Sequence, residues 1–324
     1  MQNFQIQGTE VVFLDHGKLI TESYNTDQFK CDYALNPKLF DFNQHLKKIS
    51  EATTNYLKTS AKYFNSTSSH SDFPTEFLEE DRPFISIKGR NENASAHITE
   101  IPALCKSTKF LIPARSEFFN CDVLNSLEYS NSAKKYDLII IDPPWWNKYI
   151  RRLKKVKEGL GYKMMKNENL ADIPLNSMIH ANSLVVIWCT NSSVHQTFLL
   201  ENLLPAWNMK LLSKWYWIKL NTNGNPVSEF QRQGQKQPFE VLYIATHNEN
   251  TDARMSEIKP RKILFSVPSI IHSHKPPIFE ILRKYLPEEP KCLELFARYL
   301  QPYFTSVGFE VLKLMDLRLY SPVS

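Results

Sequence analysis

Short apolar runs recur from about residue 106 to the end of the chain and predict a series of β-strands. Several of these runs are apolar on both faces, as expected for strands that helices cover on both sides of a sheet. Helical patterns fall between some of them, over 192–204 and 277–286, and the second follows "KPP", with prolines well placed for a helix start. Alternating strands and helices predict an open α/β sheet. The predicted strands are "YDLIII" (136–141), "SLVVIWC" (183–189), "LLSKWYWIKL" (211–220), "FEVLYIA" (239–245), "KILFSV" (262–267), "CLELF" (292–296) and "FEVLKL" (309–314).

The first third of the chain has a different texture. It holds one strand-like piece over Val11 to Leu14 and a helical pattern over about 40–57. The stretches "NSTSSHSDFPT" (65–75) and "KGRNENASAH" (88–97) are polar and rich in turn residues, which predicts loops. We therefore expect an N-terminal accessory region over 1–105 and an α/β domain over 106–324.

One predicted strand ends in "IIIDPPWWNK" (139–148), which combines an acid, two prolines and two tryptophans. In an open α/β sheet, ligands bind at the carboxyl ends of the strands. Pro143 and Pro144 have fixed φ angles and no N–H, so we expect their carbonyls to keep set directions with no donor nearby. Together with the Asp142 carboxylate they offer acceptors to an exocyclic amine, and Trp145 offers a face on which a planar base stacks. The alternative is a plain turn with both tryptophans in the core.

An adenine amine is a suitable guest for these acceptors. Its lone pair is conjugated with the ring, so the amine is a poor nucleophile. Acceptors on its hydrogens favour the pyramidal form that develops in the transition state of attack.

Charge is informative locally rather than globally. Lys and Arg number 39 against 34 acidic residues, and this small excess does not by itself indicate nucleic-acid binding. The stretch "WNKYIRRLKKVKEGLG" (146–161) directly follows the tetrad and is strongly basic, which predicts salt-dependent binding of phosphates. A solvated charge run or a nuclear-import signal is the alternative. The basic residues that we expect to contact substrate are Lys148, Arg151, Arg152, Lys154 and Lys155.

The cysteines, the start of the sequence and the glycines limit the classes of protein to which the chain can belong. The five cysteines are scattered without a CxxC pair, which favours a reducing compartment. No signal leader opens the sequence and no apolar run matches a membrane span, so we expect a soluble intracellular protein. The chain lacks a GxGxxG loop. His272 and His274 have no cluster of acids or cysteines beside them, so we predict no metal site. Cys121 and Cys189 are expected in the core.

The tetrad "DPPW" after a buried strand resembles the adenine-N6 methyltransferase family of the RNA m6A writers, and within it the methyltransferase-like-four branch. The tetrad alone would be shared with bacterial DNA adenine methyltransferases, but the resemblance extends over about 106–316 in the family's order. The supporting stretches are "IPARSEFFNCDV" (112–123), "GYKMM" (161–165), "LVVIWCTN" (184–191), "HSHKPPIFEILRKYL" (272–286) and "CLELFARYLQP" (292–302).

This resemblance implies a Rossmann-like domain that binds S-adenosyl-L-methionine, with the catalytic strand ahead of the cofactor strand in a permuted order. It implies catalytic roles for Asp142, Pro143, Pro144 and Trp145. The cofactor-binding residues that it implies are Asp122, Val123, Asp142, Arg298 and Glu310. For Asp122, Arg298 and Glu310 the alternative is a surface ion pair.

Two positions depart from the family pattern. Phe309 stands where the family carries an asparagine for the ribose, and Thr246 stands where some members place a lysine for the cofactor carboxylate.

The same resemblance implies that Tyr162 and Glu240 contact the target base. The implied substrate is RNA, and the implied target is an internal 2′-O-methyladenosine of U2 small nuclear RNA. We expect the protein to act as a monomer. We expect it in the nucleus, with some cytoplasmic presence. DNA adenine is a second candidate substrate, because an amine site does not distinguish ribose from deoxyribose. An inactive RNA-binding scaffold of the same fold is a third reading, which the intact tetrad disfavours.

Overall fold

The computed structural model describes residues 2–6, 9–24, 29–31, 86–101, 108–129, 134–146, 164–221, 223–231, 237–269, 271 and 274–322. The helix expected over 40–57 and the polar stretch 65–75 lie outside these residues.

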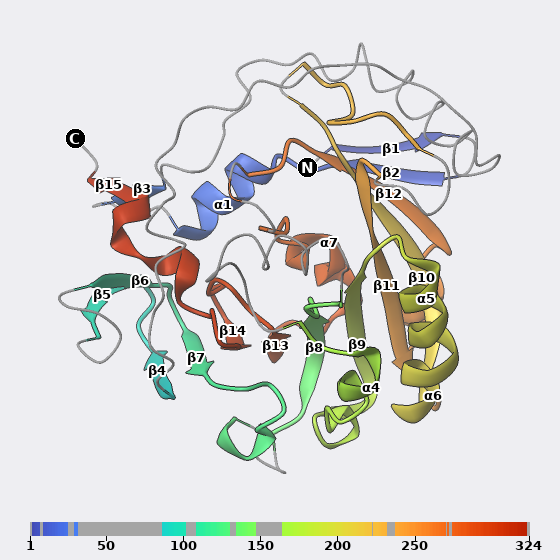
Figure 1. The fold of residues 1–324 in the computed structure, drawn as a ribbon, viewed down its shortest axis with the longest axis horizontal. Coiled ribbons are helices and arrows are strands. Elements are labelled where there is room, and N and C mark those ends of the chain that lie inside the picture. The colour runs from blue at the N-terminus through green and yellow to red at the C-terminus, as the bar shows by residue number, and fades with distance from the viewer. Residues whose placement is uncertain are drawn as a thin grey trace.

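One large sheet organises the described part of the chain. Its eleven strands follow the order β1-β2-β12-β10-β11-β9-β8-β13-β14-β7-β4 (Figure 1). Most neighbours pair in parallel, and β1, β11 and β4 run antiparallel to the strands beside them. The strands are β1 Gln2–Ile6, β2 Thr9–Phe13, β4 Ile87–Asn91, β7 Ser116–Asn120, β8 Tyr136–Ile141, β9 Ile179–Cys189, β10 Met209–Lys219, β11 Phe239–His247, β12 Arg261–Ser266, β13 Cys292–Leu295 and β14 Phe304–Val307.

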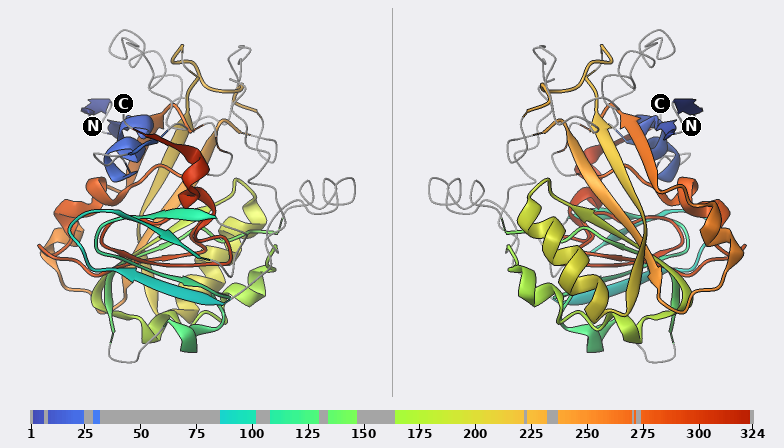
Figure 2. Two further views of the ribbon diagram at one scale, coloured as in Figure 1. Left: turned by 90° about the vertical axis from the view of Figure 1, so that its left-hand side faces the viewer. Right: turned by 90° about the vertical axis from the view of Figure 1, so that its right-hand side faces the viewer.

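Helices cover both faces of this sheet (Figure 2). On β8, Ile139 and Ile141 belong to one buried cluster, and Leu138 and Ile140 belong to another on the opposite face. The first cluster includes residues of α5 (Ser193–Phe198), the π-helical turn Leu199–Leu203 and α6 (Leu204–Ala206). The second includes residues of α7 (Phe279–Leu282) and the 3-10 turn Arg283–Tyr285. The apolar strands are therefore two-sided because each face has its own helical layer.

The prediction of an α/β sheet is confirmed, and six of the seven strands predicted after residue 106 are present. The strand predicted over 309–314 is wrong. Residues 308–312 form a turn, and Lys313–Met315 form a 3-10 helix. Val311, Leu312, Leu314 and Met315 are buried in a third cluster. Their spacing suits helical turns rather than the strict alternation of a strand. The actual last strand, β14, lies just before them.

Strands from before residue 105 join the same sheet at both of its ends. β2 pairs in parallel with β12, and β4 pairs with β7. Helix α1 (His16–Tyr24) follows β2, and the His16 ring packs edge-on against Trp217 and His274. The division at residue 105 and the permuted strand order stay predictions. Two small sheets, β3 (Phe29–Cys31) with β15 (Tyr320–Pro322) and β5 (His97–Glu100) with β6 (Lys109–Ile112), complete the described strands.

Candidate active site

A pocket lies where several parallel strands end. β7, β8, β13 and β14 all run in one direction, so the turns after them meet at one edge of the sheet. The space enclosed by the pocket and its open mouth is about 770 Å³. Its lining combines apolar side chains with three acids and an arginine. The lining residues are Asp122, Leu124, Asp142, Pro144, Met164, Met165, Asn169, Phe296, Ala297, Arg298, Phe309 and Glu310.

The tetrad begins at the end of β8 and its main chain is held by hydrogen bonds. Trp145 N–H donates to the Pro143 carbonyl at 2.8 Å, and Met165 N–H donates to the Pro144 carbonyl at 2.9 Å. The expectation that no donor lies near these carbonyls is therefore wrong. Each carbonyl oxygen keeps a second lone pair. Asp142 and Pro144 line the pocket, whereas Pro143 is buried beside them.

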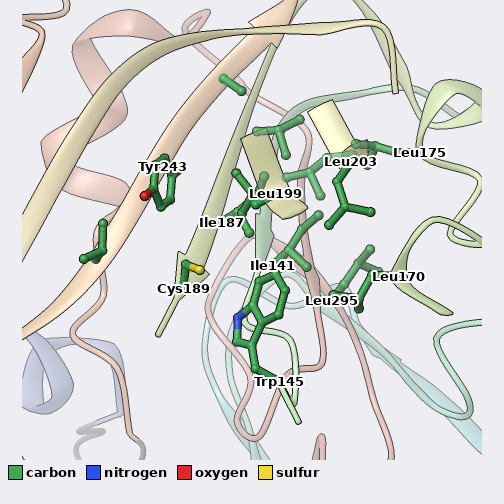
Figure 3. Packing of buried hydrophobic residues seen from close by; sticks show 14 of the residues in the cluster. Ile141, Trp145, Leu170, Leu175, Ile187, Cys189, Leu199, Leu203, Tyr243 and Leu295 are labelled. Carbon is green, nitrogen blue, oxygen red and sulfur yellow. The ribbon is translucent and has the colours of Figure 1, made fainter. Parts of the chain in front are cut away.

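The Trp145 side chain lies in the core and not at the pocket (Figure 3). It is 5% exposed, and its Nε1–H donates to the Trp188 carbonyl at 2.8 Å. Its ring centroid lies 5.1 Å from that of His195. The stacking role predicted for Trp145 is therefore corrected. Trp145 anchors the tetrad to β9, and its ring is not open to a base.

His195 holds the segment that follows the tetrad. Its Nε2 lies 2.9 Å from the Trp146 carbonyl, and its Nδ1 lies 2.8 Å from the Asn167 side-chain amide. Burial lowers the pKa of His195, so its neutral form is favoured. Both partner atoms, the Trp146 carbonyl oxygen and Asn167 Oδ1, are acceptors, and a neutral ring carries one N–H to donate to one of them. The sequence motifs did not single out His195.

Two acids share one lysine at the edge of the pocket. Lys275 Nζ lies 3.5 Å from Asp142 Oδ2 and 2.7 Å from Glu240 Oε2. Glu240 reaches this edge because β11 is antiparallel and begins here. Lys219, at the end of β10, lies 2.5 Å from the other Glu240 oxygen. The site is therefore a chain of alternating charges that runs from Lys219 to Asp142.

These charges move the two carboxyl pKa values apart. Burial raises the pKa of Asp142, and Lys275 and Arg298 offset this only in part. Burial also opposes ionisation of Glu240, but Lys275 and Lys219 outweigh it and lower the pKa of Glu240. Burial disfavours the Lys275 ammonium, yet both acids hold the pKa of Lys275 above its ordinary value. Such separation of pKa values is typical of functional sites.

Lys275 is the residue that the sequence reasoning missed. We expected Thr246 to stand in the place of a cofactor-binding lysine, and that assignment is wrong. Thr246 is buried near the end of β11, pairs with Leu184 in the sheet and donates to the Ser183 carbonyl at 2.8 Å. Because β11 is antiparallel, its end lies at the sheet edge opposite the pocket. A lysine within "SHKPP", directly before a helix, was the available signal.

Asp122 and its neighbours form the turn after β7. Asp122 Oδ1 accepts from the Leu124 N–H at 3.0 Å, which fixes the carboxylate in the turn. Asp122 and Leu124 line the pocket, whereas the Val123 side chain is buried in the core. The Val123 carbonyl accepts from the Tyr129 hydroxyl. Asp122 and Leu124, rather than the Val123 side chain, are thus the members of this turn that face a ligand.

Arg298 and Glu310 come together across two turns. Arg298 Nε lies 3.4 Å from Glu310 Oε2, and Lys313 Nζ lies 2.7 Å from Glu310 Oε1. Both Arg298 and Glu310 line the pocket, so the ion pair belongs to the pocket wall and not to an open surface. The structure therefore brings Asp122, Asp142, Arg298 and Glu310 together in the wall of one pocket, and their role at a cofactor stays a prediction.

The other predicted substrate residues are not all placed. Glu240 lies in the charge network with Lys275. The remaining ones lie outside the described residues, namely Tyr162, Lys148, Arg151, Arg152, Lys154 and Lys155.

Cys121 and Cys189 are buried, which confirms that they belong to the core. Burial raises the pKa of each thiol to about 12. Within the described ranges, no three His, Cys, Asp or Glu side chains gather as metal ligands would, and His272 lies outside those ranges. None of the described helices has the length and apolar character needed to traverse a membrane.

The fold and the site define a Rossmann-like protein whose pocket, at the carboxyl edge of the sheet, presents acids to a ligand. The model of the MT-A70 family matches residues 136–310, which is more than half of the 324-residue chain. The chain therefore belongs to the MT-A70 family, and the resemblance seen in its motifs is confirmed.

Named relatives agree with this assignment. The chain is 35% identical over 216 residues to the N(6)-adenine-specific methyltransferase METTL4 of Mus musculus, covering 64% of this chain and 44% of the relative. It is 34% identical over 215 residues to a DNA N6-methyl methyltransferase of Caenorhabditis elegans, covering 66% and 56%. It is 31% identical over 193 residues to the N6-methyladenosine RNA methyltransferase MTA1 of Pyricularia oryzae, covering 57% and 49%. The chain thus spans about half the length of these relatives.

Proposed function

We propose that this protein is an S-adenosylmethionine-dependent methyltransferase that modifies the N6 amine of adenosine in RNA. The observation that carries the proposal is the position of Asp142. Its carboxylate follows the buried strand β8, lines the pocket and is paired with Lys275. The carboxylate is thus an acceptor held at the ligand-binding edge of an α/β sheet, where an exocyclic amine is recognised through its two hydrogens.

The pocket suits the proposed cofactor in the chemistry of its lining. An adenosyl amino acid needs apolar walls for its purine, acceptors for its amine and hydroxyl groups, and a cation for its carboxylate. Leu124, Phe296 and Phe309 supply apolar walls, and Asp122 and Glu310 supply acceptors. Lys275, beside Asp142, and Arg298, beside Glu310, are the cations of the site. When bound, the cofactor supplies an activated methyl group.

The residues of this chain act by positioning and by electrostatics. Asp142, together with a free lone pair on Pro143 or Pro144, orients the amine so that its nitrogen lone pair faces the donor. Lys275 keeps Asp142 fixed and compensates its charge. The amine becomes acidic only after methylation, so no strong base is needed before attack. Glu240 lies beside Lys275 at the start of β11, and we assign it to the target base.

The preference for RNA rests on the resemblance and on the basic stretch after the tetrad. Among the relatives, one is named for RNA and one for DNA, so DNA is the second substrate to test. Within RNA we propose an internal 2′-O-methyladenosine of U2 small nuclear RNA as the target. Since this RNA is nuclear, we propose that the protein acts in the nucleus, and that it acts as a monomer. An inactive scaffold is the third alternative, and the ordered acid-lysine pair at the tetrad favours an enzyme.

Incubation of the purified chain with labelled-methyl cofactor and separate RNA and DNA pools tests the proposal. We expect label in RNA, located at N6 of adenosine by nucleoside analysis. The Asp142→Asn variant is the control, since it keeps the size of the side chain and removes its charge. Label only in DNA would overturn the RNA assignment. No label in either pool, with cofactor bound, would favour the scaffold.

A further inference from the structure

Phe309 is an apolar side chain in an unusual place. It is 43% exposed, although most large apolar residues among the described ones are buried. It is not scattered on the surface at random, because it lines the pocket beside Glu310 and Phe296. A large exposed aromatic ring in the wall of a ligand pocket usually contacts the ligand.

The backbone around Phe309 is held tightly. Its neighbour Gly308 presses against the turn after β13, where a Cβ would lie 2.8 Å from the Ala297 carbonyl oxygen. Gly308 N–H donates to the Phe119 carbonyl at 3.1 Å, and Ala297 N–H donates to the Val307 carbonyl at 3.0 Å. These contacts fix the start of the 308–310 turn between the turns after β13 and β7. The position of Phe309 is therefore set by the sheet.

The turn after β7 forms the neighbouring wall. β7 and β14 pair in parallel, with Val307 beside Phe119, so Asp122 and Leu124 emerge next to Phe309 and Glu310. This part of the pocket thus has an aromatic ring, an aliphatic side chain and an acid. A purine fits such a set, because its faces need apolar contact and its amine needs an acceptor. Glu310 already faces Arg298 and Lys313, so it adds little apolar surface.

We propose that Phe309 is the stacking surface for the purine of the bound adenosyl cofactor in this chain. The inference rests on the proposed function, because it assumes an adenosyl ligand in this pocket. Phe309 is then a specificity-determining residue, because its aromatic face recognises the cofactor. The purine end of the ligand then depends on Phe309, and the amino-acid end depends on Lys275.

Calorimetric binding of two ligands separates these ends. S-adenosylhomocysteine carries both the adenosine and the amino acid, whereas 5′-methylthioadenosine carries the adenosine without the amino acid. Phe309→Ala is expected to weaken both ligands by a similar factor, about 5- to 100-fold, as removal of one stacking aromatic side chain does. Phe309→Tyr keeps the ring and should bind both ligands nearly as the wild type does. Phe309→Leu keeps an apolar side chain without the ring and should lose affinity as Phe309→Ala does.

Tyr303→Ala is the matched control. Tyr303 is 57% exposed and aromatic, but it precedes β14 and so lies at the opposite edge of the sheet, next to Arg115. This variant should bind both ligands like the wild type. Unchanged affinity in Phe309→Ala, or full affinity in Phe309→Leu, would overturn the stacking role. Weaker RNA binding in Phe309→Ala with unchanged cofactor affinity would assign Phe309 to the substrate and also overturn it. If the wild type binds neither ligand, the proposed function itself fails.

Discussion

Two buried histidines predict that acid destabilises the folded chain. His16 follows β2 and packs against His274 and Trp217 beneath the charged site. Burial, reinforced by the nearby positive charge of Lys219, lowers the pKa of His16 from 6.5 to about 3. Burial also lowers the pKa of His274, and His16, Arg298 and Lys275 add to this effect. In the unfolded chain both rings take up a proton near their ordinary pKa, so the unfolded state binds more protons below about pH 6.5.

The size of the effect follows from linkage. One proton that is bound only by the unfolded state lowers the free energy of unfolding by about 1.4 kcal/mol per pH unit. At about pH 5, His16 alone therefore costs roughly 2 kcal/mol relative to pH 6.5, and His274 acts in the same direction. Glu294 has the opposite effect on stability, because burial raises the pKa of Glu294 to about 8. Between the ordinary pKa of a glutamate and about pH 8, the folded state therefore keeps a proton on Glu294 that the unfolded state has lost. Because His274 acts with His16 and Glu294 acts against it, we expect a net loss of stability between pH 6.5 and pH 5.

Above pH 6.5 the histidines no longer contribute, and Glu294 reverses the slope. Deprotonation of the unfolded glutamate leaves the folded state with the extra proton, so stability falls as pH rises toward 8. Stability should therefore be greatest near pH 6.5. Urea unfolding of the purified chain at a series of pH values measures this curve. His16→Phe should reduce the slope of the free energy of unfolding against pH below pH 6.5 by the amount that corresponds to about one proton. Glu294→Gln should remove the fall in the free energy of unfolding above pH 6.5. A flat curve in the wild type, or an unchanged acid slope in His16→Phe, would contradict the lowered pKa of His16 in the folded chain.

Two further predictions concern the ligands. Asp122→Ala removes the acceptor in the turn after β7 and should cost about 1–3 kcal/mol in S-adenosylhomocysteine binding, with less effect on RNA binding; unchanged calorimetric affinity would count against a role of Asp122 at the cofactor. Charge reversal in the basic stretch should weaken RNA binding across sequences, flatten the slope of log affinity against log salt and leave cofactor affinity nearly unchanged. Salt titrations of RNA binding test this, and equal slopes would reduce the stretch to a solvated face or an import signal. The residues to reverse to Glu are Arg151, Arg152, Lys154 and Lys155.

Local patterns in the sequence predicted most of the fold. β8, β9 and β13 are nearly continuous apolar runs because helices cover both of their faces. The pattern over 309–314 misled because its apolar residues serve a turn and a 3-10 helix that pack in a separate cluster. Strands β4 and β7 were not foreseen, since β4 is a half-exposed edge strand that contains a glycine and reads as a loop.

The sequence could predict a site residue where that residue directly follows a recognisable apolar strand. Asp142 is of this kind, since it stands directly after the apolar run of β8, whereas Asp122 follows the unforeseen strand β7 and was indicated by the family resemblance. Trp145 and Lys275 are not of this kind either. Tryptophan is both a stacking surface and a core residue, and only its burial against β9 decides between these roles. Lys275 reaches Asp142 through a loop far away in sequence, and the strand direction of β11 excludes Thr246. Such relations depend on the whole sheet rather than on a local pattern.

The role of Asp142 at the target amine can be measured by methyl transfer with two Asp142 variants. The measurement is the initial rate of label transfer from S-adenosylmethionine to RNA for wild type, Asp142→Asn and Asp142→Ala, beside calorimetry with S-adenosylhomocysteine. Loss of one well-placed acceptor in a preorganised site costs about a hundredfold or more in rate. We expect that loss in Asp142→Ala and a reduced rate in Asp142→Asn, whose amide oxygen still accepts but carries no charge, with folding and cofactor binding largely retained in both. A rate near that of the wild type in either variant would contradict the assignment of Asp142 to the target amine.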